Sequence, residues 1–142
     1  MPHDDLETWR ASIEDFRACK GEADWEDWLA RAAELWDPEI EWDASEGLPL
    51  DINRVYRGRE AVLEFWRAWL AAWGTLDLDY ELVDAGDHVV MLLEQHMTGR
   101  FSGIETPMRN YAQVATFRDG RMVRWKLYTS QSDALKAVGL AG

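Results

Sequence analysis

The spacing of apolar residues predicts a helix near the start of the chain. Between residues 5 and 19, apolar side chains recur every three or four positions, which is the period of one helix face: Leu6, Trp9, Ile13 and Phe16. Asp4 or Asp5 is a suitable N-cap for this helix. The Lys20-Gly21 pair ends it.

The same period predicts two further helices. The second begins after Asp24, with Asp27 three residues on as in a capping box, and Pro38 stops it. The third helix spans residues 59–73, with Gly74 as its C-terminal stop. Tryptophans dominate both apolar faces: Trp25 and Trp28 in the second helix, and Trp66, Trp69 and Trp73 in the third.

After the third helix the period changes to two, which predicts strands. Leucines and Tyr80 alternate with acidic residues over 76–82, as in a strand with one dry face and one wet face. Strands are also expected at 40–43, 89–98, 108–118 and 122–129, and a short helix closes the chain. Residues 44–58 read as a loop punctuated by glycine and proline.

Two registers are possible for the last hairpin. A two-residue turn at 119–120 would pair Phe117 with Met122 and would put basic side chains on the apolar face. A shift of one residue pairs Ala115 with Trp125 and turns the bases to the other face. Burial favours the second register, which predicts a glycine bulge or a three-residue loop at this turn.

Composition narrows the class of protein. The 142 residues carry 47% hydrophobic side chains and a net charge of −12, which suits one packed domain and opposes binding to nucleic acid or to an anionic membrane surface. No apolar run is long enough to span a membrane, and the N-terminus lacks the apolar stretch of a signal peptide. Cys19 is the single cysteine, so a cytoplasmic protein is expected.

Three segments together resemble a known superfamily: DPEIEWD, YRGREAV and the ending DGRMVRWKLYTSQSDALKAVGL. They are similar to the nuclear transport factor 2-like superfamily, in its polyketide-cyclase (SnoaL-like) and ketosteroid-isomerase-like branch. The likeness covers nearly the whole chain, so one domain over 1–142 is expected. It implies a cone-shaped, cystatin-like α+β barrel in which three N-terminal helices pack on a curved, mostly antiparallel sheet, with a short C-terminal helix. It also implies a homodimer through the outer sheet face.

The resemblance bears on function less sharply than on fold, because the scaffold hosts isomerases, cyclases, epoxide hydrolases, dehydratases and proteins without catalysis. In the isomerases an aspartate on the strand after the second helix is the general base, and Asp43 falls at the matching place. Two hydrogen-bond donors of the isomerases are replaced, one by Phe16 and one by Gln113. Steroid isomerisation by the known mechanism is therefore not implied.

The expected fold and the second hairpin register place a pocket on the concave face of the sheet. Its walls are apolar with a few polar groups, as in sites for small molecules. The expected inward side chains include Ala115, Phe117, Val123, Met91 and Leu93. The candidate substrate-binding residues are Trp66, Trp69, Trp73, Gln95, Met97, Arg109, Trp125 and Leu127.

Three residues are candidates for catalysis. Asp43 would face the tryptophan-lined pocket, where desolvation raises the pKa of a carboxyl toward proton transfer. Gln113 would orient or stabilise a carbonyl oxygen, with Tyr111 as a second donor. Each has a structural alternative: an exposed aspartate at a strand end, a buried glutamine paired with a neighbouring strand, and a packed tyrosine ring with a wet tip.

Three hypotheses about function follow, and none requires a cofactor. The protein is a cofactor-independent proton-transfer enzyme acting on an apolar or aromatic small molecule, a non-catalytic protein that binds such a molecule, or an interaction module that uses the outer sheet face. A carboxylate inside the pocket favours the first, and a dry pocket with Asp43 turned away favours the second. No metal site is expected, since His88 and His96 would lie roughly 27 Å apart along one strand at about 3.4 Å per residue.

Overall fold

The computed structural model describes residues 4–46 and 54–140. In these ranges the chain forms four helices and six strands in the order α1 (Asp5–Arg17), α2 (Glu22–Ala33), β1 (Trp36–Asp43), β2 (Val55–Arg57), α3 (Arg59–Ala71), β3 (Trp73–Ala85), β4 (His88–Gly99), β5 (Glu105–Arg118), β6 (Arg121–Tyr128) and α4 (Gln131–Ala137). The order of helices and strands is the one that the apolar spacing predicts, except that β2 was expected to be loop. Residues 47–53 of that expected loop lie outside the described residues.

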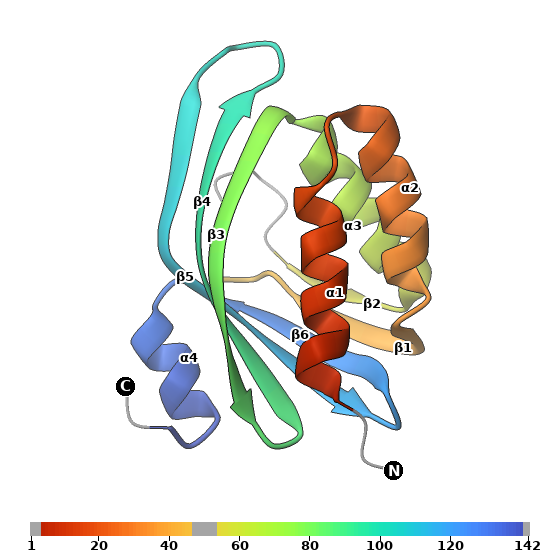
Figure 1. Ribbon diagram of the computed structural model, residues 1–142, viewed down its shortest axis with the longest axis vertical. Helices are drawn as coiled ribbons and strands as arrows, with labels where there is room; N and C mark the ends of the chain where they lie inside the picture. Colours follow the sequence, from red (N-terminus) through yellow and green to blue (C-terminus); the bar gives the residue numbers. More distant parts are fainter. Residues whose placement is uncertain (1–3, 47–53, 141–142) are drawn as a thin grey trace.

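The six strands form one curved sheet in the order β2-β1-β6-β5-β4-β3. Only the β1–β6 pair is parallel, and the other four pairs are antiparallel. The sheet is open, because β2 and β3 are its two edges. Helices α1, α2 and α3 lie on one side of it and α4 lies on the other (Figure 1). This arrangement confirms the expected α+β fold, in an unclosed form.

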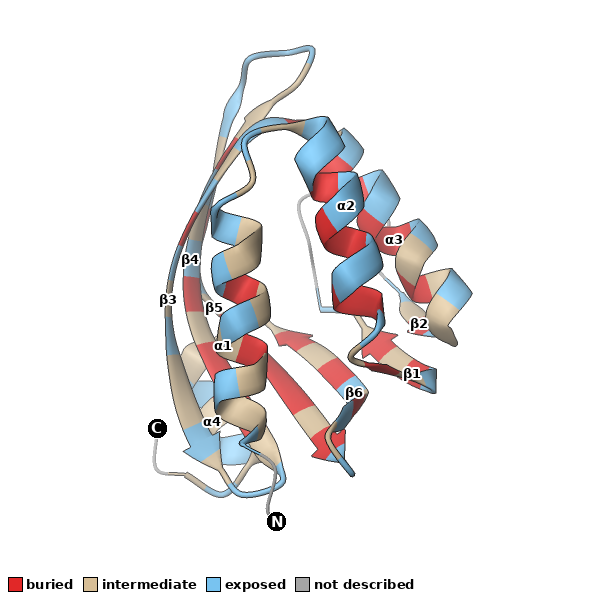
Figure 2. Ribbon diagram, turned by 45° about the vertical axis from the view of Figure 1, so that its right-hand side comes forward, coloured by how far each residue is buried: buried red, intermediate tan, exposed pale blue. Residues whose placement is uncertain are grey.

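The core fills the space between the concave face of the sheet and the first three helices. All nine tryptophans belong to it, and none is more than 9% exposed. Figure 2 shows buried segments on the facing sides of the helices and the strands. Because each indole buries a large apolar area, this cluster is the main source of stability for a domain of this size.

The junction between α2 and β1 differs from the prediction. The N-cap of α2 is Gly21, and no side chain caps the helix. The Asp24 carboxylate instead accepts a hydrogen bond of 2.9 Å from the backbone N–H of Lys20. Pro38 does not stop the helix but lies inside β1, where the pairing with β6 shifts register between Trp36 and Glu41. A proline is tolerated there because the ladder is already interrupted.

Helix α3 ends at Ala71, two residues earlier than predicted, and an arginine side chain hydrogen-bonds to its C-terminal end. Trp73 opens β3, and Gly74 lies in that strand. The Arg100 guanidinium donates to the backbone oxygens of Ala71 at 3.0 Å and of Trp73 at 3.1 Å. It therefore satisfies carbonyl groups that a helix C-terminus leaves without partners.

The last hairpin combines features of the two registers considered from the sequence. Asp119 and Gly120 have φ angles of 53° and 78°, as in a two-residue type I′ turn, and Arg118 pairs with Arg121. The expected bulge or longer loop at the turn is therefore wrong. The ladder shifts by one residue at Val123, so that Ala115 pairs with Trp125 as expected. The bulge lies within β6, and it turns both Met122 and Trp125 into the core.

A second bulge lies in β5, and it was not expected. Gln95 pairs with Met108 and Leu93 with Tyr111, so β5 has one residue more than β4 over this span. Arg109 and Asn110 fill the bulge, both exposed, with Asn110 at a φ of 63°. Met108 therefore faces the core, and Arg109 does not lie on the concave face.

The type I′ turn predicts a specific sensitivity at Gly120. Gly120→Ala should lower the free energy of unfolding by about 1 kcal/mol, because an L-residue is strained at positive φ. Urea unfolding followed by circular dichroism measures the change. Asp119→Gly is the matched control, and it should change stability by no more than about 0.5 kcal/mol in either direction. Equal midpoints for Gly120→Ala and the wild type would contradict the turn assignment.

Candidate functional site

A small hollow lies between the concave face and the first three helices. Its open volume is about 50 Å³. Three helices, five strands and the connection between α2 and β1 contribute to its lining: Trp9, Ser12, Ile13, Phe16, Trp28, Ala32, Leu35, Trp36, Trp66, Trp69, Leu76, Leu78, Met91, Gln95, Gln113, Met122 and Trp125. The half-buried members of this lining are Ser12, Phe16, Leu35, Leu76 and Gln95.

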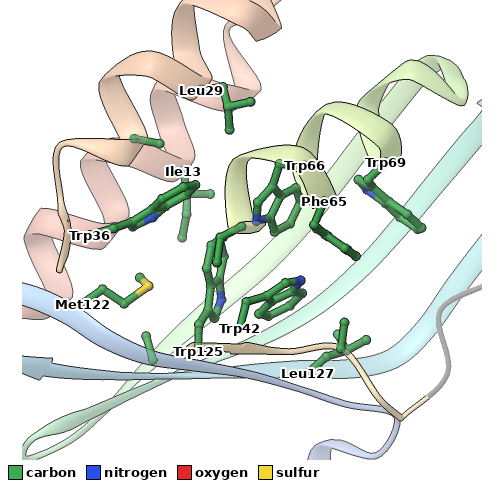
Figure 3. Close-up of a cluster of buried hydrophobic side chains, with 14 of the residues drawn as sticks. Ile13, Leu29, Trp36, Trp42, Phe65, Trp66, Trp69, Met122, Trp125 and Leu127 are labelled. Carbon is green, nitrogen blue, oxygen red and sulfur yellow. The ribbon is translucent and has the colours of Figure 1, made fainter. Parts of the chain in front are cut away.

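Trp125 is the hub of the aromatic wall. Its ring lies 5.1 Å from that of Trp66 in a stacked arrangement and 4.7 Å from that of Trp42. It also contacts Trp36 at 6.1 Å and Trp9 at 6.3 Å, the latter edge to face. Figure 3 shows Trp42, Trp66 and Trp125 together above the sheet. These separations are typical of favourable aromatic pairs, so the wall is rigidly packed.

One hydrogen bond orients the polar group at the floor of the hollow. The Trp125 indole N–H donates to Oε1 of Gln113 at 2.8 Å, and the Gln113 side chain is 6% exposed. Because the indole nitrogen only donates, this bond fixes which end of the amide is oxygen. The Gln113 N–H₂ group donates none of the hydrogen bonds found among the described residues, so it is available as a donor.

A second donor in the wall lacks a partner. The Trp66 indole nitrogen is fully buried and makes no hydrogen bond within the described part of the chain. In Figure 3 this nitrogen is turned toward the middle of the cluster. A buried donor without a partner costs about 1–3 kcal/mol. The Trp28 indole, by contrast, donates to the backbone oxygen of Ser12 at 2.9 Å. The hollow therefore has two donors that could serve a ligand, the Gln113 N–H₂ group and the Trp66 N–H.

Among the residues that the structure describes, the lining contains no ionisable side chain. Its polar members are one serine and two glutamines, and the remainder are apolar or aromatic. General acid–base catalysis needs a titratable group within hydrogen-bond reach of the substrate. The hollow provides none from the residues that line it.

Asp43 lies on the opposite side of the sheet from the hollow. Its neighbour Trp42 is 1% exposed and points into the core, and alternation along β1 turns Asp43 outward. Its carboxylate accepts hydrogen bonds from the backbone N–H of Ser45 at 3.0 Å and from its hydroxyl. Lys126, also on the outer face, lies 3.8 Å away. The expectation that Asp43 faces the pocket is therefore wrong.

The surroundings of Asp43 favour its charged form. Partial burial by itself would raise the pKa of this carboxyl. The hydrogen bonds from Ser45 and the nearby charges of Lys126 and Arg124 outweigh it, and they hold the pKa below its ordinary value. A carboxylate stabilised in this way is a poor base at neutral pH.

The other candidate residues divide into two groups. The hollow is lined by Trp66, Trp69, Gln95, Gln113 and Trp125. Outside its lining lie Trp73, Met97, Arg109, Tyr111 and Leu127. Met97 and Leu127 are core residues at 0% and 1% exposure, and Trp73 packs on Trp69 at 5.3 Å. Burial raises the pKa of Tyr111, which packs against the same core.

Helix α1 supplies a wall that the sequence did not assign to the pocket. Trp9, Ser12, Ile13 and Phe16 line the hollow from this helix. Their apolar members form the stripe that predicts the helix, so the signal for burial was present. The spacing of these residues shows that one face of the helix is buried, but it does not show what that face packs against.

The outer face of the sheet is less apolar than expected. Helix α4 covers Val90, Ala112 and Val114 through Ala134. Over β1 and β6 the face carries ion pairs that join Arg124 to Glu41 at 3.5 Å and Lys126 to Glu46 at 3.9 Å, besides the pair with Asp43. A homodimer through this face stays a prediction. The face offers little uncovered apolar surface that a partner could bury.

Solved structures share this architecture. An NTF2-like protein of unknown function from Burkholderia pseudomallei superposes with a TM-score of 0.73, at 18% identity, covering 97% of this chain and 99% of that one. TerC, crystallised with polyporic acid, gives 0.67 at 21% identity over 94% and 97%. A protein with a ketosteroid isomerase-like fold from Catenulispora acidiphila, in complex with trimethylamine, gives 0.60 at 16% identity over 91% and 92%. At these identities the likeness is one of fold.

The fold is an α+β fold like that of these NTF2-like neighbours. Residues 9–125 match the SnoaL-like domain, and the chain belongs to that family. A search of curated protein sequences finds no match. In the described ranges, no helix has the length and apolarity to cross a membrane.

The surroundings of Asp43 predict a pH-dependent contribution to stability. Since its pKa is lower in the folded state, the carboxylate stabilises the fold above the pKa of the unfolded group, about 4, and the gain is lost as pH falls through the folded pKa. Asp43→Asn should therefore be less stable than the wild type at pH 7, and the difference should vanish by about pH 2–3. Urea midpoints across this range measure it.

Asp77→Asn is the matched control for this measurement. Asp77 is exposed on β3 and makes no ion pair within the described residues. Its replacement should change the midpoint little at any pH. A destabilisation by Asp43→Asn that is the same at pH 7 and pH 3 would show that the charge of Asp43 contributes nothing.

Proposed function

We propose that this protein binds a small, uncharged, largely apolar molecule in the hollow lined by Trp66, Trp69 and Trp125, and that its own side chains supply no acid–base catalysis there. The observation that carries the proposal is the lining itself, which is mainly aromatic and apolar and includes no ionisable group among the described residues. Of the three functions expected from the sequence, this corresponds to the non-catalytic binding protein.

The size of the hollow sets a condition on binding. A cavity of about 150 Å³ is known to hold benzene, whereas the space here is about 50 Å³. A ring therefore enters only if side chains move. Met91 and Met122 are suited to this because methionine adapts its shape at low cost. A molecule would enter past half-buried members of the lining such as Phe16 and Leu76.

The free donors define the polar group of the ligand. Gln113 offers its N–H₂ group, and the Trp66 N–H is buried without a partner. A carbonyl or a similar oxygen on the ligand would accept from them and would remove the cost of an unpaired buried donor. An ammonium group would find aromatic faces but no carboxylate.

Two structural neighbours support binding of small molecules on this scaffold. TerC was crystallised with polyporic acid, and the Catenulispora acidiphila protein with trimethylamine. The first is an organic acid and the second is an amine, so the neighbours differ in the chemistry they hold. The donors of this hollow favour a molecule with oxygen acceptors.

Proton transfer by Asp43 has less support. The carboxylate faces away from the hollow, and its hydrogen bonds and ion pair stabilise the charged form. Tyr111 is not among the lining residues, so the second expected donor is also displaced.

Filling part of the hollow should weaken binding. Ser12 is half-buried in the lining, and Ser12→Leu would fill the space beside it without removing the backbone oxygen that Trp28 uses. Titration of the wild type with acetophenone should give a saturable change in tryptophan fluorescence. The variant should bind at least ~10-fold more weakly, because its new side chain competes for the same volume.

Ala11→Leu and Asp43→Asn are the controls for this titration. Ala11 is the neighbouring position in α1 and is exposed, so Ala11→Leu adds the same side chain outside the hollow. Both controls should keep the wild-type dissociation constant within about two-fold. A wild type whose fluorescence responds to no apolar ring compound would end the proposal.

The donor at Gln113 should make binding selective for an acceptor. Acetophenone and α-methylstyrene have nearly the same shape, but only the ketone accepts a hydrogen bond. The wild type should prefer the ketone by about 5–10-fold, the size of one net hydrogen bond. Gln113→Leu should abolish the preference while retaining α-methylstyrene binding.

If Gln113→Leu does not fold, Trp66→Phe tests the same preference for a hydrogen-bond acceptor. It removes the buried donor and leaves the bond between Trp125 and Gln113 in place. The preference for the ketone should fall, and affinity for α-methylstyrene should not. Tighter binding of benzylammonium than of acetophenone by the wild type would show that the hollow selects cations instead.

A further inference from the structure

The two large apolar side chains most exposed to solvent sit at one place. Phe101 is 95% exposed and Ile104 is 65% exposed, and they are the exposed large hydrophobic residues of the described chain. Both belong to the tip of the β4–β5 hairpin, residues 99–105. Figures 1 and 2 show this tip projecting beyond the ends of the helices. An apolar pair at the end of a projection marks an interaction surface more than scattered surface residues do.

The tip is held in shape by its own hydrogen bonds. The backbone N–H of Gly99 donates to the oxygen of Ile104 at 2.9 Å, and that of Gly103 donates to the oxygen of Gly99 at 3.0 Å. The Ser102 hydroxyl accepts from the N–H of Ile104 at 3.1 Å. The exposed side chains are thus presented by an ordered turn, which lowers the entropic cost of docking.

A groove of matching character lies between α2 and α3. Its volume is about 210 Å³, which exceeds the roughly 150 Å³ that holds a benzene ring. Trp25, Leu29 and Leu70 form its apolar floor, and Glu22, Glu26, Arg67 and Ala71 complete its lining. This α2–α3 groove is separate from the tryptophan-lined hollow, with which it shares no residue.

The tip and the groove are neighbours on the molecule. Arg100 of the tip forms an ion pair with Glu22 at 3.0 Å and donates to the backbone oxygen of Ala71 at 3.0 Å. Both of these partners line the groove. A projection and a recess side by side make a self-complementary surface, because a two-fold axis places each projection against the recess of the other copy.

We infer that two copies of this chain associate by reciprocal insertion of Phe101 into the α2–α3 groove. Charge supports a second copy as the partner. The chain has a net charge of −12, whereas residues 95–110 carry two arginines and one glutamate, so the tip can approach a groove lined by Glu22 and Glu26 of another copy without net like-charge repulsion. Two tips and two grooves bury on the order of 1,000 Å², near the lower limit for specific pairs. The dimer is therefore weak, with a micromolar dissociation constant.

Sedimentation velocity over a range of protein concentration tests this dimer. The wild type should show a reversible monomer–dimer equilibrium in the micromolar range. Phe101→Ser should weaken it at least ~10-fold, as expected for a central aromatic anchor, without affecting the fold, because the side chain is exposed. Arg124→Glu, on the outer sheet face, is the matched control and should leave the equilibrium unchanged.

Cross-linking identifies the partner surfaces directly. On a Cys19→Ser background, chains with Phe101→Cys and chains with Ala71→Cys should form a covalent heterodimer when mixed under oxidising conditions. Chains with Arg124→Cys should not couple to those with Ala71→Cys. A wild type that stays monomeric at all concentrations would overturn the inference. So would a dimer that Arg124→Glu disrupts and Phe101→Ser does not.

Discussion

The hydrogen bond from the Trp125 indole to Gln113 is the interaction on which the interior depends. It joins β6 to β5 inside the core, and the same indole touches tryptophans from α1, β1 and α3. Without that bond the amide would be a buried polar group of uncertain orientation, and the hub ring would lose its fixed position. One donor–acceptor pair thus sets both the packing of the aromatic wall and the polarity of the floor.

The sheet separates two kinds of chemistry. Its concave face carries indoles, methionines and amides, and its convex face carries α4 and a set of ion pairs that includes Asp43, Lys126 and Glu41. A carboxylate is easily kept ionised on the wet side, and burying it on the dry side would carry a large desolvation cost. The position of Asp43 is therefore the one that electrostatics favours in this chain, and it accounts for an interior that recognises molecules by shape and by hydrogen-bond donors.

Much of the fold follows from the sequence, because periodicity and turn residues act locally. The stripe of Trp9, Ile13 and Phe16 and the alternation after residue 76 predict their elements correctly. The predictions are wrong where contacts between residues far apart in the sequence determine where an element ends or which way a side chain faces. Helix α3 ends where Arg100 reaches back from the turn between β4 and β5. The side that Asp43 faces depends on the side of β1 on which the neighbouring Trp42 finds its partners. The family resemblance pointed to Asp43 as a candidate, but packing determines which side of the sheet its carboxylate faces.

The bulge at Arg109 and Asn110 has a consequence for anyone aligning related chains. On either side of it, the rule that odd and even positions face opposite ways is inverted, so Met108 and Tyr111 share an interior that simple counting would divide. A homologue that lacks the extra residue would have every position on one side of that point displaced in an ungapped alignment. Functional residues transferred along this strand by column number alone would then be assigned to the wrong surface.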